Sequence, residues 1–385
     1  MSRQTLGEAC SRLSSGKSIL SNKVLDKGLY PVIGGNGRRG FTNSYNFEGR
    51  CAVIGRQGAA CGNVHYFSGK AYMTEHAVVA CAANGNDSHY LAYLLSTMNL
   101  GRLSGQSAQP GLSVRTLSKQ FIDLPSLKKQ RQVVELLGSL DEKIEVNARA
   151  NGYLHDLVMA ASKSIYREIE TTDAPLPDGW RWVEVEEIAE LVSRGITPKY
   201  DESSAETVLG QTCVRNNLVL IENGRHHKPK KINEKWLREG DLLINSTGVG
   251  SLGRTAQVWF EPEKLTVDSH ITIVRTRKPE HALYLGFWAF AHERYIESLH
   301  TGSTGQTELP RDHVKAIRFV LPDAATLSWF NSIAEPAVKA IVANQVESKR
   351  LEALRDALLP KLMSGEVDVS EVELPTRPNS HLCER

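Results

Sequence analysis

The sequence predicts an α+β protein in which two similar modules of mixed strands and short helices are separated by two long helices packed as a coiled-coil-like pair. Three observations lead to this prediction: the chain contains an internal duplication, a heptad pattern closes each copy, and short β-rich runs fill the remainder. The chain has 385 residues, of which 41% are hydrophobic and 23% are charged. That composition is typical of globular domains, and that length exceeds one ordinary core.

Composition and pattern exclude several classes of protein. No apolar run reaches the roughly 18 residues that a membrane span needs, and the first residues lack the regions of a secretory signal. We therefore expect a cytoplasmic protein without membrane contact. The six cysteines form no C-x-x-C pair and no other zinc spacing. They are expected to be free thiols in a reducing compartment, and we predict no metal site and no cofactor.

The duplication becomes visible when the sequence is compared with itself at an offset of 197 residues. The coinciding residues include Gly105 and Gly302, Gln109 and Gln306, Leu112 and Leu309, Pro125 and Pro322, and Asn147 and Asn344. Upstream, where loops differ in length, His76 and His270 end the similar runs YMTEH and TVDSH. The order is therefore module, helix, module, helix. We expect modules at 1–123 and 173–320, helices at 124–172 and 321–370, and a loose tail at 371–385.

Both helical segments carry a seam whose residues are spaced alternately by four and three, which is a heptad pattern. The seam residues include Leu137, Leu140, Ile144, Asn147 and Leu154 in the first copy, and Ile341, Asn344, Leu351 and Leu358 in the second. A buried Asn in such a seam fixes register and partner. We predict that the two segments pack on each other; the alternative is two unrelated amphipathic helices. Pro336 should start or kink the second helix, and Gly365 should end it.

The modules contain short elements bounded by Gly, Asn and Asp. Strands are expected at 29–33, 51–55, 241–245, 255–260 and 270–275, and helices at 90–98 and 284–296. The segment 171–180, which holds two prolines and an Asp-Gly pair, is expected to be the linker between the copies.

Motifs for catalysis are missing from the sequence. Gly35–Gly40 fits G-x-G-x-x-G, but the following FTNSYNFEG is a poor helix, so a dinucleotide site is not expected. The alternatives are a simple Gly-rich turn or a loop whose Asn36, Arg38 and Arg39 reach DNA. The chain lacks the nucleotide-hydrolysis and base-methylation signatures, and the nuclease-like spacing of Glu347 and Lys349 lies on the seam-bearing helix. We predict no catalytic residues.

Charge and polar loops instead indicate nucleic-acid binding. Residues 1–123 carry 13 basic and 6 acidic side chains, and residues 211–260 carry 8 and 4. Such clusters favour a polyanion partner, the alternative being an ordinary solvated basic surface. Polar, Gly-rich loops recur in pairs, at 103–113 with 300–310 and at 54–63 with 244–254. Their Gln, Asn, Arg, Ser and Thr side chains can read base edges, while basic side chains can bind phosphates.

The candidate DNA-binding residues come from these loops and from the basic clusters. They are Asn36, Arg38, Arg39, Arg56, Gln57, Asn63, Lys70, Ser104, Gln106, Gln109, Arg115, Arg215, Arg225, Lys228, Lys230, Lys231, Ser246, Thr247, Arg254, Ser303, Thr304 and Gln306.

From about Thr5 to Val369 the chain resembles the specificity subunit of type I restriction–modification systems. The resemblance rests on YPVIGGNGRRGFTNSYNFEG, GQSAQPGLSVRTL, IDLPSLKKQRQVVELLGSLDEKIEVN, LPDGWRWVEVEEIAELVSRGITPK and LRDALLPKLMSGEVDV. It implies that each module is a target recognition domain that reads one half of a split, asymmetric site in double-stranded DNA. It also implies that the helices form an antiparallel pair, set the gap between the half-sites and dock two methyltransferase subunits, to which restriction subunits add. The distal helix departs from the pattern, because it reads ATLSWFNS where the first copy has a charged start.

The sequence therefore predicts a non-catalytic, sequence-specific DNA-binding subunit of such a complex. Two alternatives remain open. One is a protein-interaction scaffold, and the other is the specificity chain of a methyltransferase-only or fused nuclease–methyltransferase system.

Overall fold

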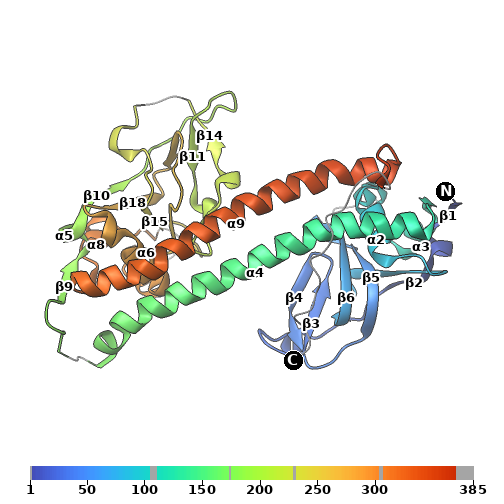
Figure 1. Ribbon diagram of the computed structural model, residues 1–385, viewed down its shortest axis with the longest axis horizontal. Coiled ribbons are helices and arrows are strands. Elements are labelled where there is room, and N and C mark those ends of the chain that lie inside the picture. Colours follow the sequence, from blue (N-terminus) through green and yellow to red (C-terminus); the bar gives the residue numbers. More distant parts are fainter. Residues whose placement is uncertain (1, 105–110, 173–174, 229–230, 303–306, 370–385) are drawn as a thin grey trace. The chain divides into compact units, whose positions relative to one another are not determined.

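The computed structural model describes residues 2–104, 111–172, 175–228, 231–302 and 307–369. It contains two compact units, the first formed by Met1–Glu145 with Ser348–Arg385 and the second by Val146–Glu347. Two long helices, α4 (Leu127–Thr172) and α9 (Ala324–Ser364), each contribute a segment to both units (Figure 1). The predicted α+β architecture of two mixed modules and two long helices is confirmed. Within the ranges given above, no helix combines the length and the apolar character needed to cross a membrane.

A six-stranded sheet forms the framework of the first unit. In spatial order its strands are β2 (Cys10–Ser15), β7 (Ala77–Ala82), β5 (Phe47–Gly55), β6 (Val64–Met73), β3 (Tyr30–Gly34) and β4 (Gly37–Thr42). Neighbours are antiparallel except β3 and β6. Alternate residues of β5 face opposite sides, as a strand period of two requires. Ile54 packs with α2 (Ser88–Ser96), whereas Val53 belongs to a separate apolar cluster.

The second unit divides its strands between smaller sheets. A four-stranded sheet has the order β10 (Ala189–Arg194), β18 (Ile271–Thr276), β15 (Leu242–Asn245) and β16 (Thr255–Gln257). A three-stranded sheet has the order β14 (Arg225–His226), β11 (Thr207–Leu209) and β17 (Leu265–Val267), and β12 (Val214–Arg215) pairs with β13 (Leu218–Val219). The helix α6 (Ala282–Ala291) supplies Tyr284, Phe287 and Trp288, which are at most 2% exposed, to the core of the unit.

A two-stranded sheet leads into each long helix. In the first unit β1 (Ser2–Thr5) pairs with β8 (Phe121–Leu124), which precedes α4. In the second, β9 (Arg181–Glu184) pairs with β19 (Arg318–Leu321), which precedes α9. The remaining helices are short: α1 (Leu6–Ala9), α3 (Val114–Ser118), α5 (Val185–Ile188), α7 (Glu293–Ser298) and α8 (Arg311–Lys315).

The two long helices run antiparallel within the first unit. Arg355 of α9 donates from Nη1 to Asp141 Oδ1 of α4 at 2.9 Å, and Leu362 shares an apolar cluster with Leu137. Residue numbers therefore fall along α9 as they rise along α4.

The same antiparallel order holds within the second unit, where the two seam asparagines lie. Asn147 is 2% exposed, and its Nδ2 donates to Glu347 Oε2 at 2.7 Å. Asn344 donates from Nδ2 to Asn151 Oδ1 at 2.8 Å. Polar pairing of this kind defines a register that apolar contacts alone leave open. The other seam residues are buried or half-buried, namely Leu137, Leu140, Ile144, Leu154, Ile341, Leu351 and Leu358.

Two predicted helix boundaries differ from the structure. Pro336 does not start the second helix, because α9 begins at Ala324 and continues through it. The residues on both sides of the proline, such as Phe330 and Ile341, are buried in the unit core, and this burial offsets the roughly 3 kcal/mol that an interior proline costs. The helix expected at 284–296 is divided at His292 into α6 and α7. Gly365 ends α9 with a positive φ of 80°, as expected.

Candidate nucleic-acid interface

The predicted reading loops of the first unit meet at one end of the six-stranded sheet. Gly35–Gly40 forms the β3–β4 turn and the start of β4, so it begins no helix and has no dinucleotide-binding geometry. A side chain at Gly35 would lie 2.8 Å from the carbonyl oxygen of His76, which shows how closely this turn packs on the β6–β7 turn. The backbone N–H of Arg56 donates to the same carbonyl at 2.9 Å. Gln57 pairs with Gly111, so the end of the 103–113 loop reaches the same place.

The second unit repeats this arrangement with different residues. Ser246 N–H donates to the carbonyl of His270 at 2.8 Å, as Arg56 does to His76. Leu309 N–H donates to Ser246 O at 2.8 Å, and Thr247 pairs with Glu308. The paired loops that the sequence indicated therefore share one backbone hydrogen-bond frame.

A glycine in each unit shows how closely the two frames agree. Gly16 N–H donates to Ala77 O at 3.0 Å, and Gly195 N–H donates to Ile271 O at 3.1 Å. A side chain at either glycine would lie 2.1 Å from a backbone oxygen, that of Met73 or of Val267. Only glycine fits these positions, so the match of Gly16 with Gly195 at an offset of 179 residues has a steric reason in both modules.

An arginine anchors the end of the polar loop in both units, but it comes from different strands. Arg56, at the end of β5, donates from Nε to Leu112 O at 3.3 Å and reaches Ser15 Oγ at 3.5 Å. Arg194, on β10, donates from Nη2 to Leu309 O at 2.8 Å. The guanidinium of Arg56 thus serves the loop itself, a role that its position among the predicted DNA contacts did not suggest.

The remaining candidates fall into four groups. The exposed ones are Asn36, Arg38, Arg39, Gln57, Asn63, Lys70, Arg115, Arg215, Arg225, Lys228 and Lys231, and the half-buried ones are Ser104, Thr247 and Arg254. Ser246 is fully buried and bonded to Thr272 Oγ1 at 2.7 Å, so it offers no atom to a base. Six candidates lie outside the described residues: Gln106, Gln109, Lys230, Ser303, Thr304 and Gln306.

Some of the exposed basic side chains rest on aromatic rings. Arg225 lies 3.5 Å from the ring centroid of Tyr200, and Arg38 lies 5.0 Å from that of Phe41. Lys70 pairs with Glu48 at 3.6 Å, and this carboxylate raises the pKa of Lys70. Contacts of this kind hold the cations in place at the surface, where their charge suits contact with phosphates.

Sequence reasoning missed His76, His270, Arg194 and Gln211 as members of this region. Gln211 donates from Nε2 to Thr247 Oγ1 at 2.7 Å. The repeated runs YMTEH and TVDSH marked the two histidines as equivalent, but only the fold places them beside the reading loops.

Carboxylates of α4 tie the module helices to the long helix in each unit. Asp141 accepts from the Tyr93 hydroxyl of α2 at 2.5 Å and from Arg355. Burial, together with this carboxylate, raises the pKa of Tyr93, so the phenol remains a hydrogen donor. Glu170 accepts from Trp288 Nε1 at 2.8 Å and lies 3.0 Å from His292 Nε2.

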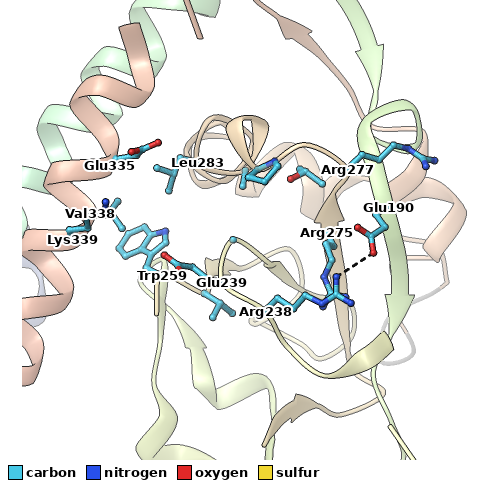
Figure 2. Close-up of a pocket in the computed structure, with 15 residues that line it drawn as sticks. Glu190, Arg238, Glu239, Trp259, Arg275, Arg277, Leu283, Glu335, Val338 and Lys339 are labelled. Atoms are coloured by element: carbon cyan, nitrogen blue, oxygen red, sulfur yellow. Dashed lines mark hydrogen bonds and ion pairs between the residues drawn. The ribbon is translucent and has the colours of Figure 1, made fainter. Parts of the chain in front are cut away.

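A pocket of about 430 Å³ lies within the second unit, beside α9 (Figure 2). Some of its charged side chains are paired: Glu190 lies 3.4 Å from Arg238, and Arg275 binds Asp241 at 2.7 Å. Burial raises the pKa of Asp241 against the opposing effect of Arg275. Across the described parts of the chain, no three His, Cys, Asp or Glu residues are grouped to hold a metal ion.

Comparison with known proteins finds a matching family model for part of the chain. Residues 4–152 match the family model described as a type I restriction modification DNA specificity domain. The type I restriction enzyme EcoprrI specificity subunit of Escherichia coli is 36% identical over 143 residues, which are 36% of this chain and 35% of that protein. The MjaIX specificity subunit of Methanocaldococcus jannaschii is 24% identical over 317 residues, covering 75% of this chain and 71% of the relative.

The fold also matches a solved structure over almost its whole length. The chain is similar to the crystal structure of the type I restriction-modification system S subunit from M. genitalium, with a TM-score of 0.63 and 14% sequence identity. The match covers 94% of this chain and 95% of that one. The chain is therefore similar to type I restriction–modification specificity subunits, over residues 4–152 in the family model and over almost its whole length in fold.

Proposed function

We propose that this chain is the DNA-reading subunit of a type I restriction–modification complex, and that its two modules, 1–123 and 173–320, read the two halves of a split, asymmetric site. One observation carries the proposal: both modules build the same hydrogen-bond frame at the ends of their strands and fill it with different polar side chains. A duplicated frame with different contents suits two half-sites of different sequence. The chain is a recognition subunit and not an enzyme.

The long helices have the second role in this proposal. A helix of 46 residues, such as α4, has a length of about 69 Å at 1.5 Å per residue. Modules that read one face of duplex DNA need a separation of about one turn, roughly 34 Å, or more. Because α4 and α9 pair in both units, they are suited to set this gap. We infer that they also dock two methyltransferase subunits, through which restriction subunits join the complex, and that the assembly works on DNA in the cytoplasm.

The test is selection of duplexes from a random library by the chain purified with its methyltransferase subunit. We expect a motif of two short specified segments separated by an unspecified gap, and affinity that falls steeply as salt rises. Replacing the module at 173–320 with that of a relative should change one segment and leave the other. A complex without DNA affinity would favour a protein-interaction scaffold. A single continuous motif would contradict the proposal that each module reads one half-site.

A further inference from the structure

We propose that His76 and His270 are the positioning residues of the two reading sites. Each holds one loop side chain, Gln57 or Thr247, in the orientation in which that side chain meets a base. The inference rests on the proposed DNA-reading function and goes beyond it by naming the residues that orient base contacts in each half.

In the first unit, the imidazole of His76 fixes one end of an exposed amide. Its Nδ1 lies 2.9 Å from Gln57 Oε1. The backbone link from Arg56 N–H to His76 O joins the two loops next to this contact, so ring and amide are held at a set separation. With its oxygen engaged, the Gln57 amide presents two N–H donors to solvent. Donors of this kind match base edges that offer acceptors in the major groove, such as purine N7 or guanine O6.

The other ring nitrogen of His76 also has a neighbour. Nε2 lies 3.3 Å from Glu75 Oε1. Both nitrogens therefore face acceptor groups, and the ring has none left for a base. This geometry makes His76 a residue that acts through Gln57 and does not read DNA itself.

In the second unit, the same backbone position carries the same ring with a different partner. His270 Nδ1 lies 2.8 Å from Thr247 Oγ1. Ser246 N–H donates to His270 O, just as Arg56 N–H donates to His76 O. Asp268 Oδ1 accepts from the backbone N–H of His270 at 2.8 Å and fixes this turn. The hydroxyl of Thr247 is therefore oriented by the histidine on one side and by Gln211 on the other.

The pairing is not explained by core packing. His270 is exposed, and the side chain of His76 is 42% exposed, so neither ring adds much apolar burial. The two units keep the histidine and change its partner from an amide to a hydroxyl. Two half-sites of different sequence require this combination, in which the positioning histidine is retained and the base-contacting side chain differs.

The experiment uses the full chain in complex with its methyltransferase subunit and the duplex selected by the unmodified complex. Affinity is measured for that duplex and for variants with one base pair changed at each specified position. We expect His76→Ala to weaken cognate binding about 5- to 50-fold and to flatten discrimination at one base pair of the first half-site only. His270→Ala should do the same in the second half-site.

Two further variants separate positioning from simple structural loss. Gln57→Ala combined with His76→Ala should weaken binding no more than Gln57→Ala alone, because the histidine acts through the amide. His76→Asn, which can place an amide donor near the Nδ1 position, should restore part of the discrimination. His65→Ala and His300→Ala are matched controls, since both histidines are exposed and lie in the same modules.

The result identifies which proposal fails. If the unmodified complex selects no split site, the DNA-reading function is wrong. If it does, but His76→Ala and His270→Ala leave base preference unchanged or lower affinity equally at every base pair, the positioning role is overturned. Additive losses in the Gln57 and His76 cycle would also overturn it.

Discussion

The two modules are held by equivalent backbone hydrogen bonds, yet the side chains that support them differ in kind. One position beyond the Ala52–Ala80 pair of β5 and β7, the first module places Cys51 opposite Cys81. At the matching place on β15 and β18, the second module has Asp241 and Arg275, an ion pair of 2.7 Å that is at most 6% exposed. A pair of thiols and a buried ion pair thus occupy equivalent cross-strand positions.

Two other supporting interactions occur in both modules, but the residues that make them have exchanged positions. The loop-anchoring arginine is at the end of β5 in the first module, with Ser15 on β2, whereas the second has Arg194 on β10 and Ser246 at the end of β15. On the two-stranded sheets, Arg3 of β1 lies 5.1 Å from the ring centroid of Phe121 on β8. In the second module the cation and the aromatic ring have exchanged strands.

In the second module Trp182 is on β9 and Arg318 is on β19, and Arg318 lies 5.6 Å from the centroid of the Trp182 ring. These exchanges show that the backbone frame depends on each interaction being made, and not on which of the two positions supplies the residue. An arginine on a loop carbonyl, or a cation over a ring, serves from either strand because the backbone brings both positions together.

The largest expected difference between the modules concerns the buried ion pair. Arg275→Met should destabilise the second module by about 3–5 kcal/mol, because it leaves the Asp241 carboxylate buried without its partner. Arg275 also donates to the carbonyls of Glu234 and Trp236, at 3.0 and 2.8 Å. Cys81→Ser, the equivalent change in the first module, should cost no more than about 1 kcal/mol.

Hydrogen exchange of the β15–β18 amides, compared with the β5–β7 amides, measures both effects locally. The double variant Asp241→Leu/Arg275→Met should recover part of the loss, since it removes both charges. Equal destabilisation of the two modules by Arg275→Met and Cys81→Ser would show that the cross-strand positions are not energetically distinct.

The exchanged arginine and serine give the next prediction. Arg56→Ser should destabilise the loop end by about 1–2 kcal/mol, because the Leu112 carbonyl loses a charged donor. Adding Ser15→Arg should restore most of that stability by recreating the arrangement in which Arg194 serves Leu309. The measurement is the exchange rate of the Leu112 amide, which donates to Arg56 O at 2.8 Å.

Ser14→Arg is the control, because it adds the same side chain one position away on β2, where neighbouring side chains point to opposite faces. If Ser15→Arg rescued the loop no better than Ser14→Arg, the two positions would not be interchangeable sources of the anchor.

Much of this architecture could be predicted from the sequence, since the heptad seams and the polar loops leave local signals. The exchanges could not. Ser15 corresponds to Arg194 at an offset of 179 residues, whereas Leu112 corresponds to Leu309 at an offset of 197. The offsets align these positions in sequence, but they do not tell which side chain contacts the loop until backbone hydrogen bonds bring the segments together. Where both position and residue type change, as for Arg56 and Ser246, no residue pattern remains to be found.

Tertiary burial explains the failures as well. Pro336 is a strong local signal against a helix interior, but α9 is held by apolar contacts on both sides of it. In the reading region, the loops were predicted from their composition, whereas the histidines were missed. A histidine beside a strand turn carries no signal for its role until the fold brings it within 3 Å of a loop side chain, as His76 is to Gln57 at 2.9 Å.

The smallest expected effect concerns the pH dependence of the two thiols. The hydrogen bond with Cys51 lowers the pKa of Cys81 to about 7, and Arg12 acts in the same direction, while the bond and burial raise the pKa of Cys51. A thiol whose pKa is lower in the folded state adds stability that is complete above its ordinary value near 9 and is lost as pH falls through 7. The first module should therefore gain about 1 kcal/mol between pH 7 and pH 9, relative to Cys81→Ser.

The second module supplies the internal control, because Asp241 and Arg275 occupy the equivalent positions and no thiol is present there. The amide exchange rates of β5 and β7 are divided by those of β15 and β18 in the same sample. This ratio removes the pH dependence that is common to both modules. A Cys51→Ala variant should lose the gain, since the thiolate of Cys81 would have no thiol donor. If Cys81→Ser and the unmodified chain responded identically to pH, the thiol pair would act only by apolar packing. It would then differ from the ion pair at the equivalent position of the second module.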